Sequence, residues 1–405
     1  MVGSKHHPNN IIDPAGGANQ TRLRAYNERL VLSLVRRHGS LPRSEIARRS
    51  GLSAQTASVI VRSLEKDGLL LREEPVRGKV GQPSVPMTLN PAGAYSFGLK
   101  IGRRSSELFL VDFLGKPIHG LKSYYGYPLP KKVLKFAVQG MSRLSDGLNE
   151  QQQHRIAGIG VAMPFELWNW AEKIQAPEDK MKTWRETDFV EQLRTQGAHP
   201  VFIQNDATSA CGAELFFGQG GELTDFMYFF IGTFIGGGVV INHSLYSGRT
   251  GNAGAVGPMP VGGHLRNGSQ LMDHASIFTL ENELKKKGIH LPARKLDGTS
   301  WESFGDTVDW WVETTGTHLA VAIASCCSVI DFEAVIIEGN IPEEIKHRIL
   351  KSIEKKIKTL DFSGIETPQI LAGTVGRDAR ALGAASLPLF SRYLLDQSIL
   401  FKTTN

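Results

Sequence analysis

Two polar residues stand where a strand is expected to end. Asn205 and Asp206 close the run "PVFIQND" and precede an alanine-rich segment that predicts a helix. A carboxylate at the carboxyl end of a strand, beside the start of a helix, is well placed to accept a proton from a bound hydroxyl group. Aspartate also caps helices, so Asp206 has a second interpretation as the cap of a helix that begins at Ala207.

A glycine-rich turn offers a second kind of chemistry. The stretch "GTFIGGG", residues 232–238, lies between two apolar runs. Successive backbone N–H groups in such a turn can hold an anion. The candidate phosphate-binding residues are therefore Gly232, Thr233, Gly236 and Gly237. A purely structural β-turn explains the same residues equally well.

The segment "LKIGRRSSELFLVDFLGK", residues 99–116, predicts a hairpin with strands at 99–101 and 108–113. Its turn region carries Lys100, Arg103 and Arg104 and no carboxylate. Magnesium requires oxygen ligands, so this turn lacks the group that a metal-bound phosphate needs. The two arginines have the charge to bind a phosphate directly, but the sequence favours a solvated loop face for them.

The first 90 residues predict elements that would bring a helix to DNA. Apolar residues recur at helical spacing in 21–38, a short helix is expected at 43–49, and a third helix follows Ser53. This is the helix-turn-helix order, and a strand, a Gly/Pro-rich tip and a returning strand add a wing. We therefore expect a disordered arm at 1–20, a winged helix-turn-helix DNA-binding domain at 21–90 and a second region at 91–405.

The charge distribution supports DNA binding. Residues 1–90 hold 14 Lys and Arg against 7 Asp and Glu, a net of +7, which leaves 32 of the 46 basic and 33 of the 40 acidic residues for the rest, a net of −1. A localised positive footprint is what a polyanion binder needs. The predicted DNA-binding residues are Arg43, Arg48, Arg49, Ser53, Gln55, Thr56, Ser58, Arg62, Arg77 and Lys79. The alternative is a three-helix bundle with an ordinary solvated face.

Composition narrows the class of protein. A chain of 405 residues with 41% apolar and 21% charged residues is typical of a globular protein with two or three domains. It has no apolar run of bilayer length, and its N-terminus lacks the apolar core of a signal peptide. Its three cysteines, Cys211, Cys326 and Cys327, have no C-x-x-C spacing. We expect a reducing, cytoplasmic environment.

From Ala94 onward, strand pairs followed by helices occur twice, which predicts a two-lobed α/β architecture with a cleft. Several segments in this order resemble the ROK family (repressors, open reading frames, kinases): "IAGIGVAMP", "VFIQNDATSACGAELFFG", "IGTFIGGGVVINHSLYSGRTGNAGAVGPMPV", "VIIEGN" and "GTVGRDARALGAA". The resemblance covers nearly all of residues 21–390. It implies the actin-like (ribonuclease H-like) sugar-kinase fold, to which the family's repressors add a winged helix.

The resemblance also implies roles for particular residues. In the family's kinases the residue at Asn205 contacts a sugar hydroxyl, and the one at Asp206 takes the proton from the hydroxyl being phosphorylated. The candidate ligand-binding residues are Asn205, Asp206, Phe165, Glu166, Asn252 and Asp273. Phe165, with Trp168 and Trp170 after it, has an aromatic ring that could stack on a sugar, although core packing explains the aromatic residues equally well.

Departures from the family pattern indicate lost chemistry. The kinase aspartate of the hairpin is Lys100 here, the sugar-binding glutamates are Ala255 and Met272, and a zinc-binding histidine is Pro258. Residues 254–276 contain no cysteine, so we expect no zinc and no other cofactor. His264 and His274 are more simply ordinary hydrogen-bonded residues.

These observations favour a DNA-binding transcriptional repressor of carbohydrate metabolism genes. Its degenerate sugar-kinase domain would sense a small carbohydrate or sugar derivative and set the geometry of a homodimer on double-stranded operator DNA. Asp206 would then be a vestigial base rather than a catalytic residue. One alternative is an ATP-dependent sugar kinase with a DNA-binding arm, and another is a regulator controlled by a protein partner.

Overall fold

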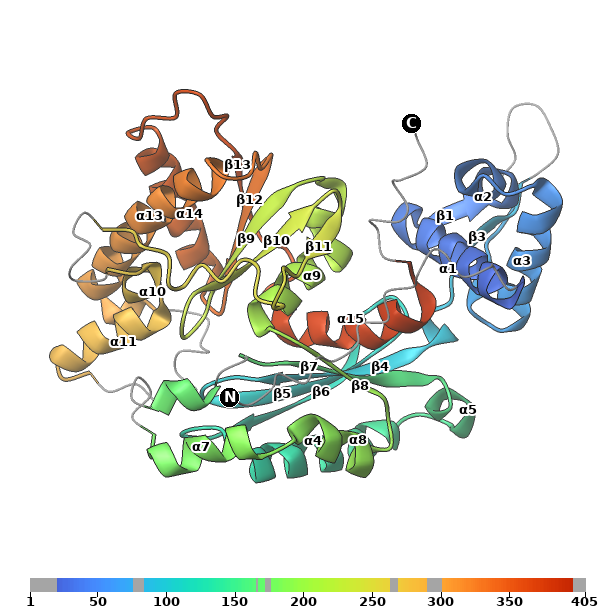
Figure 1. Ribbon diagram of the computed structural model, residues 1–405, viewed down its shortest axis with the longest axis horizontal. Helices are drawn as coiled ribbons and strands as arrows, with labels where there is room; N and C mark the ends of the chain where they lie inside the picture. The colour runs from blue at the N-terminus through green and yellow to red at the C-terminus, as the bar shows by residue number, and fades with distance from the viewer. Residues whose placement is uncertain are drawn as a thin grey trace.

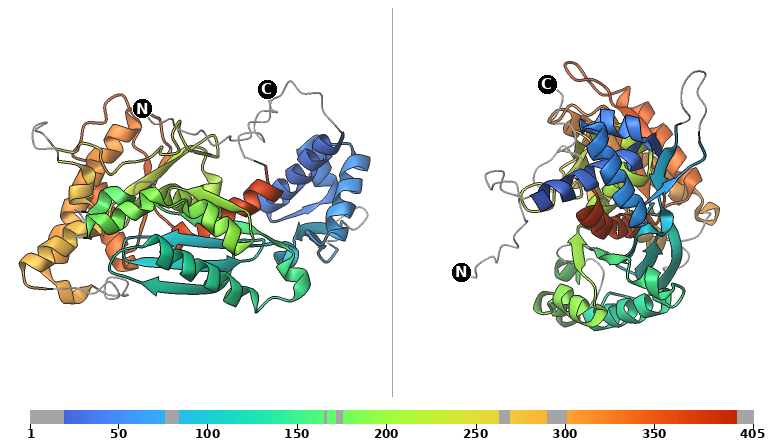
Figure 2. Two further views of the ribbon diagram at one scale, coloured as in Figure 1. Left: turned by 60° about the horizontal axis from the view of Figure 1, so that its bottom comes forward. Right: turned by 90° about the vertical axis from the view of Figure 1, so that its right-hand side faces the viewer.

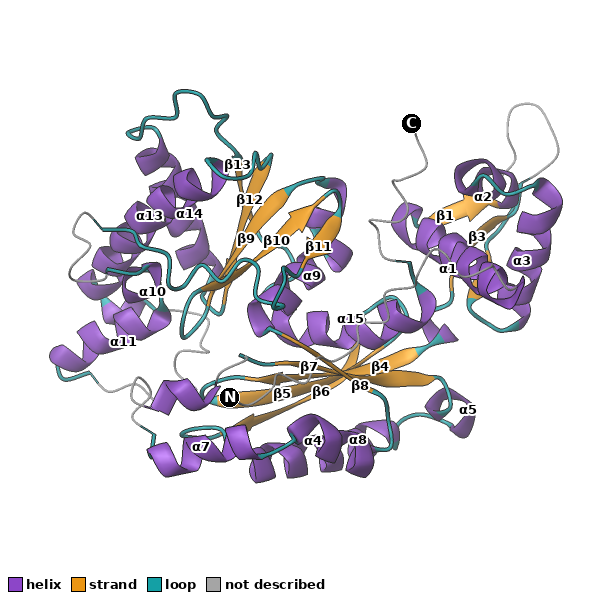
Figure 3. Ribbon diagram, in the orientation of Figure 1, coloured by secondary structure: helices purple, strands orange, loops and turns teal. Residues whose placement is uncertain are grey.

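The computed structural model describes residues 20–75, 84–164, 167–171, 176–262, 269–289 and 301–395. A small helical body with a three-stranded sheet lies beside two larger layers, each built on a five-stranded sheet (Figure 1). Figure 3 shows helices on both faces of the two larger sheets. Among the described helices, none combines the length and apolar character needed to cross a bilayer.

The N-terminal elements form the predicted winged helix. They are α1 (Gln20–His38), β1 (Ser40–Pro42), α2 (Arg43–Ser50), α3 (Ala54–Lys66), β2 (Leu70–Arg72) and β3 (Pro86–Leu89), with the antiparallel sheet order β1-β3-β2. Gly51 has φ +68°, which allows the turn between α2 and α3. Ser53 caps α3 as expected, because its Oγ accepts a hydrogen bond from the backbone N–H of Thr56 at 3.1 Å.

The first lobe is a sheet whose two faces differ in side-chain size. Its strands are β4 (Tyr95–Ile101), β5 (Ser105–Val111), β6 (Pro117–Tyr124), β7 (Ile156–Ala162) and β8 (Val201–Gln204), in the order β6-β5-β4-β7-β8. Large residues such as Phe97 and Leu99 pack against α4 (Pro130–Ser145). Also on this lobe are α5 (Glu150–Gln153), α7 (Glu178–Glu186) and α8 (Phe189–Gly197). The opposite face, with Gly98 and Gly160, receives α15 (Ala379–Tyr393) (Figure 1).

The second lobe is buried on both faces. Its strands are β9 (Phe226–Ile231), β10 (Gly236–Ile241), β11 (Ser244–Tyr246), β12 (Ala334–Gly339) and β13 (Gln369–Ala372), in the order β11-β10-β9-β12-β13. Alternate residues of β9 pack on α9 (Asp206–Phe217) and on the helices of the other face, so the whole strand is apolar. The helices of the other face are α10 (Leu271–His274), α11 (Ile277–Lys286), α13 (Asp306–Cys327) and α14 (Glu343–Ile357). The short 3-10 turns are η1 (Pro91–Gly93), η2 (Leu167–Trp170), η3 (Gln219–Glu222) and η5 (Glu302–Phe304).

The backbone of helix α15 lies in direct contact with the backbones of strand β7 and helix α9. A Cβ atom added to Gly160 would lie 1.7 Å from the carbonyl oxygen of Ala384, and one added to Gly383 would lie 1.8 Å from that of Ser209 on α9. Side chains at these two positions would therefore push α15 away from β7 and from α9. Glycine is required here by the close approach of the backbones.

We predict that Gly383→Ala lowers the free energy of unfolding by about 2 kcal/mol, because overpacking outweighs the helix propensity that alanine adds. Gly126→Ala is the matched control, since a Cβ there meets open space, and its effect should stay within about 0.5 kcal/mol. Denaturant unfolding of the two variants and the wild type measures the difference. Equal stability of the two variants would show that α15 has room for a Cβ atom at position 383.

Candidate functional site

The β4–β5 hairpin is tightly held at its tip. The backbone N–H of Gly102 donates to the carbonyl oxygen of Ser105 at 3.0 Å, and the hydroxyl of Tyr125 donates to the carbonyl oxygen of Gly102 at 2.8 Å. The predicted hairpin is present, with Lys100 opposite Glu107 in the register, but the first strand begins at Tyr95 and the second runs from Ser105 to Val111 instead of 108–113. The turn therefore has a fixed position relative to the first sheet.

The prediction of a solvated loop face for Arg103 and Arg104 is wrong. The Arg103 side chain is 7% exposed, and its Nη1 donates to Glu281 Oε2 at 3.1 Å. Arg104 Nη2 donates to the same oxygen at 2.7 Å. Glu281 belongs to α11 of the second lobe, so the hairpin tip is covered by a distant part of the chain. The two arginines thus join the lobes through one buried carboxylate.

Lys100 is buried in an ion pair of the first lobe. Its Nζ donates to Glu107 Oε1 at 3.2 Å and to Ser105 Oγ at 3.1 Å, and Lys122 Nζ lies 3.0 Å from the same Glu107 oxygen. Burial lowers the pKa of Lys100 to about 8, with a further contribution from Arg380, while Glu107 opposes the shift. Burial alone would raise the pKa of Glu107, but Lys100, Lys122 and Arg380 outweigh it and hold this pKa at about 2.

Asn205 and Asp206 lie at the carboxyl end of β8, as predicted, and Asn205, not Asp206, caps the helix that follows. Asn205 Oδ1 accepts hydrogen bonds from the backbone N–H groups of Ala207 and Thr208, at 3.0 and 3.3 Å, so Asn205 is the N-cap of α9. The interpretation of Asp206 as the cap is therefore wrong. Asp206 is the first residue of the helix, and its Oδ2 lies 3.3 Å from Arg380 Nη1.

The glycine-rich segment divides between a turn and a strand. Gly232 and Thr233 lie in the turn after β9, and their carbonyl oxygens accept from the backbone N–H groups of Ile277 and Phe278 at the start of α11. Gly236 and Gly237 lie in β10, where they pair with Phe230 and Phe229 of β9. Phosphate binding by Gly232, Thr233, Gly236 and Gly237 remains a prediction.

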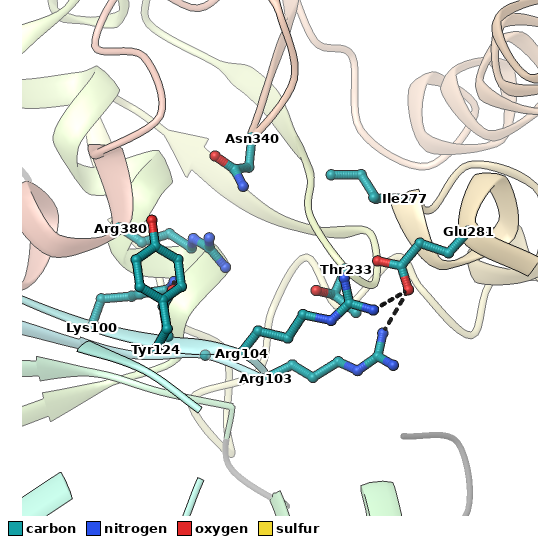
Figure 4. Close-up of a pocket in the computed structure, with 11 residues that line it drawn as sticks. Lys100, Arg103, Arg104, Tyr124, Thr233, Ile277, Glu281, Asn340 and Arg380 are labelled. Carbon is teal, nitrogen blue, oxygen red and sulfur yellow. Dashed lines mark hydrogen bonds and ion pairs between the residues drawn. The ribbon is translucent and has the colours of Figure 1, made fainter. Parts of the chain in front are cut away.

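A pocket lies between the hairpin of the first lobe and the turn and α11 of the second (Figure 4). We call it the inter-lobe pocket, and its volume is about 50 Å³. It is lined by Lys100, Gly102, Arg103, Arg104, Ser105, Tyr124, Thr233, Ile277, Glu281, Asn340 and Arg380. Four of these described lining residues are cationic and one is a carboxylate. Glu281, Asn340 and Arg380 were not among the predicted site residues, because they reach the pocket only through tertiary packing. Asn340 and Arg380 lie in the family segments "VIIEGN" and "GTVGRDARALGAA", to which no role was assigned.

Asn205 and Asp206 do not line the inter-lobe pocket, and the remaining predicted ligand-binding residues lie elsewhere or outside the described ranges. Asn252 and Asp273 are exposed and do not line the inter-lobe pocket. Asp273 Oδ2 accepts from the backbone N–H of Gln270 at 3.1 Å and closes the capping box of α10. Phe165 and Glu166 lie outside the described residues. Their contacts with a ligand remain predictions.

Of the two candidate metal-binding histidines, only His274 lies within the described residues. His264 lies outside the described residues, whereas the His274 ring stacks on His318 with 3.7 Å between centroids and its Nε2 bonds Ser269 Oγ. Burial, and then the charge of His318, lower the pKa of His274. Within the described ranges, no three His, Cys, Asp or Glu side chains gather closely enough to hold a metal ion.

The predicted DNA-binding residues of α3 lie among its exposed and half-buried positions. Gln55, Thr56 and Arg62 are exposed and Ser58 is half-buried, whereas α3 buries Ala57, Ile60, Val61 and Leu64. In α2, Arg48 and Arg49 both bond Glu45, and these hydrogen bonds hold the pKa of Glu45 at about 2. Arg43 Nη2 lies 3.5 Å from Glu65 Oε2. Arg77 and Lys79 of the wing tip lie outside the described residues.

The architecture is that of a winged helix-turn-helix protein with a two-lobed sugar-kinase-type body. A profile described as "ROK family" matches residues 96–389, and one described as "Winged helix-turn-helix DNA-binding" matches residues 24–70. The chain belongs to the ROK family, as the sequence motifs predicted.

Two curated relatives align over almost their full length. The "Xylose repressor" of Bacillus subtilis (strain 168) is 23% identical over 379 residues, which cover 91% of this chain and 96% of the relative. The "DNA-binding transcriptional dual regulator NagC" of Escherichia coli (strain K12) is 24% identical over 399 residues, which cover 93% of this chain and 96% of the relative. Both are similar to this chain from the winged helix through the second lobe.

Solved structures share the fold. A ROK family transcriptional regulator, described as a homolog of the E. coli MLC protein, superposes with a TM-score of 0.66 at 17% identity and covers 93% of this chain and 98% of its own. A ROK family glucokinase from Streptomyces griseus, in complex with glucose and AMPPNP, has a TM-score of 0.57 at 21% identity. It covers 73% of this chain and 99% of its own.

We predict that Glu107→Gln lowers the free energy of unfolding by about 3 kcal/mol at pH 7, because Lys100 loses its buried counter-charge. The loss should be smaller at pH 9, since the pKa of Lys100 is about 8 and its charge is then largely absent from the wild type as well. Urea unfolding at both pH values measures the effect.

Glu191→Gln is the control for this prediction. It breaks the exposed pair with Arg194, which contributes little. In the wild type, the stability due to the low pKa of Glu107 is present above its ordinary value of 4.5 and is lost as the pH falls toward 2. A loss in Glu107→Gln that is equal at pH 7 and pH 9 would contradict the assigned pairing.

Proposed function

We propose that this chain is a cytoplasmic, sugar-responsive transcriptional repressor. Residues 21–90 bind operator DNA, and residues 91–405 bind a small carbohydrate or sugar-derived effector. One observation carries the proposal: a winged helix and a kinase-type body occur in the same chain. The winged helix has exposed polar residues on α3, and the hairpin of the body holds a buried Lys100–Glu107 ion pair. The two curated relatives described above are named as a repressor and a transcriptional regulator, which supports the same function.

The hairpin argues against phosphoryl transfer. The family's kinases use a carboxylate at the position of Lys100, and a buried ammonium group cannot ligate magnesium. Asp206, the residue at the position of the kinase base, is held by Arg380. The position of Asn205 and Asp206 at the end of β8 is the observation that favours the alternative, an ATP-dependent sugar kinase. We infer that the body senses its ligand and does not phosphorylate it.

Coupling between the sensor and the winged helix has a physical basis in shared packing. One apolar cluster contains Val31 and Val35 of α1, Phe113 after β5, and Leu389 of α15. Polar contacts cross the same boundary, because Arg155 donates to the carbonyl oxygen of Asp67 at 3.3 Å and to two further carbonyl groups. The winged helix is thus packed on the body rather than tethered by a linker.

Helix α15 connects the pocket to this boundary. Arg380, in its first turn, lines the inter-lobe pocket, while Phe390 near its other end lies under the guanidinium group of Arg36 of α1, 5.3 Å from ring centroid to Cζ. Fifteen helical residues span about 22 Å. Figure 2 shows the winged-helix elements next to the C-terminal end of α15 from two other sides. Effector-driven movement of the pocket end would be transmitted along this helix as a rigid element.

A homodimer is the proposed DNA-bound form. Winged-helix repressors place two recognition helices on half-sites about one turn of DNA apart, so a change in their spacing changes operator affinity. The effector then lowers operator affinity only as far as it binds the DNA-free conformation of the protein more tightly than the DNA-bound one.

We predict that Arg62→Ala relaxes sequence discrimination. Full-length protein is first used to select its DNA site from random duplexes, and binding to the selected and scrambled sites is then compared. Loss of a base contact should reduce the discrimination by about 1 to 3 kcal/mol, whereas Arg48→Ala should weaken both sites alike. Lys131→Ala, on the exposed face of α4, is the control. Full discrimination in both Arg62→Ala and Gln55→Ala would rule out α3 as the recognition helix.

A second experiment separates the sensor from the kinase alternative. We expect no ATP-dependent phosphorylation of hexoses or pentoses by the purified protein with magnesium, because the hairpin supplies no metal ligand at position 100. A coupled assay for ADP release measures turnover. Turnover that is present in the wild type and absent from Asp206→Asn would establish the kinase and refute the proposed loss of catalysis.

A further inference from the structure

One exposed side chain of α3 is not explained by the packing of the winged helix. Val59 is 58% exposed, whereas its neighbours Ile60 and Val61 are buried in the core of the winged helix. Branching at Cβ makes valine a poorer helix former than alanine. Val59 therefore adds little burial and no helix propensity. Single exposed apolar residues also occur on ordinary protein surfaces, so the surroundings of Val59 decide what it does.

Val59 lies in the middle of a row of exposed side chains. Gln55 precedes it by four residues and Arg62 follows it by three, and we call these three residues the α3 row. At 3.6 residues per turn, their side chains lie within about 60° of one another around the helix axis. The buried residues of α3 lie on its opposite side, and Figure 1 shows α3 along the outer edge of the winged helix. The α3 row therefore faces away from the protein core.

The polar members of the α3 row are not engaged by the rest of the described chain. The arginines of α2 bond a carboxylate, as Arg48 does with Glu45. Within the described ranges, by contrast, no hydrogen bond or ion pair occupies the side chain of Gln55 or Arg62. These two side chains are therefore available to a ligand of the winged helix, and Val59 lies between them.

The α3 row fits the major groove of duplex DNA. The second helix of a helix-turn-helix lies in that groove with its first turns at the base edges, and α3 begins directly after its cap Ser53. Arginine bonds guanine, glutamine bonds adenine, and apolar side chains contact the 5-methyl group of thymine. In zinc fingers, residues about one helical turn apart contact successive bases. Gln55, Val59 and Arg62, each about one turn from the next, would thus reach neighbouring base pairs.

We propose that Val59 is a specificity-determining residue, which contacts the 5-methyl group of a thymine between the base pairs that Gln55 and Arg62 reach. The inference rests on the proposed repressor function and adds one base to the DNA sequence that this function requires. The contact removes an exposed apolar side chain and an exposed methyl group from water together. It distinguishes thymine from cytosine without a hydrogen bond, because cytosine has no methyl group there.

The test compares thymine with uracil in the DNA site that the full chain selects from random duplexes. Uracil lacks only the 5-methyl group and pairs with adenine in the same way. Each thymine of the selected site is replaced in turn, and the affinity is measured at one fixed salt concentration. Since one methyl group is then missing from the contact, we expect uracil at one position of a half-site to weaken binding about fourfold.

Two variants of Val59 and one control complete the test. Val59→Ala should bind thymine and uracil equally at that position and leave all other positions unchanged. Val59→Thr retains a methyl group that can contact thymine, so it should keep the preference. Ile118→Ala is the matched control, because it removes a β-branched side chain that is 38% exposed on β6 of the first lobe, and the fourfold preference should persist. Substitutions at such exposed positions change stability little.

Three results would overturn the proposal. They are equal binding of thymine and uracil at every position, a thymine preference that persists in Val59→Ala, and a selected half-site that contains no thymine. The first and the third are obtained with the wild-type protein, so they do not depend on the folding of a variant.

The sequence discrimination of Arg62→Ala and Gln55→Ala, measured on the same DNA, separates this inference from the proposed function. If these variants lose discrimination while the wild type binds thymine and uracil alike, α3 is the recognition helix and the role of Val59 is refuted. If the full chain selects no DNA sequence at all, the proposed repressor function is refuted, and this inference with it.

Discussion

Backbone contact between α15 and its neighbours is the constraint on which the rest of the structure depends. Glycine at 160 and 383 lets the helix lie against β7 and α9 with no side chain between them. The helix therefore has one position along its axis, with Arg380 at the pocket and Leu389 in the cluster that it shares with the winged helix. Relative movement of the two lobes has to occur along this contact, which limits the motion to small shifts of packed helices.

The charged side chains of the hairpin are paired with one another and with α11. Glu107 and Glu281 each bond two cations, one pair within the first lobe and one pair across the lobes. Such buried networks add little net stability, because desolvation offsets most of the attraction. Their effect is to fix which groups meet, and here they keep the hairpin tip and α11 in register across the pocket.

The sequence predicted those features that depend on local pattern or residue type. The cap at Ser53, the winged helix and the missing carboxylate at position 100 follow from a few adjacent residues, and the family resemblance supplied the two-lobed body. The prediction that Arg104 is solvated was wrong, because Glu281, 177 positions away in the chain, accepts a hydrogen bond from it. The cap of α9 was placed one residue late, since Asn205 and Asp206 have equal capping ability and only the backbone angles decide between them.

The arginines of α2 carry their own counterion. Arg48 and Arg49 share Glu45, whose low pKa keeps it negative at every physiological pH, so the three side chains together present one positive charge instead of two. Glu45 takes a place that free anions would otherwise occupy near these arginines, and it stays covalently attached when DNA arrives. At the predicted DNA contact, a phosphate would have to compete with a tethered carboxylate whose local concentration does not fall on dilution. The two arginines would then attract nucleic acid in general less strongly than an unpaired pair would.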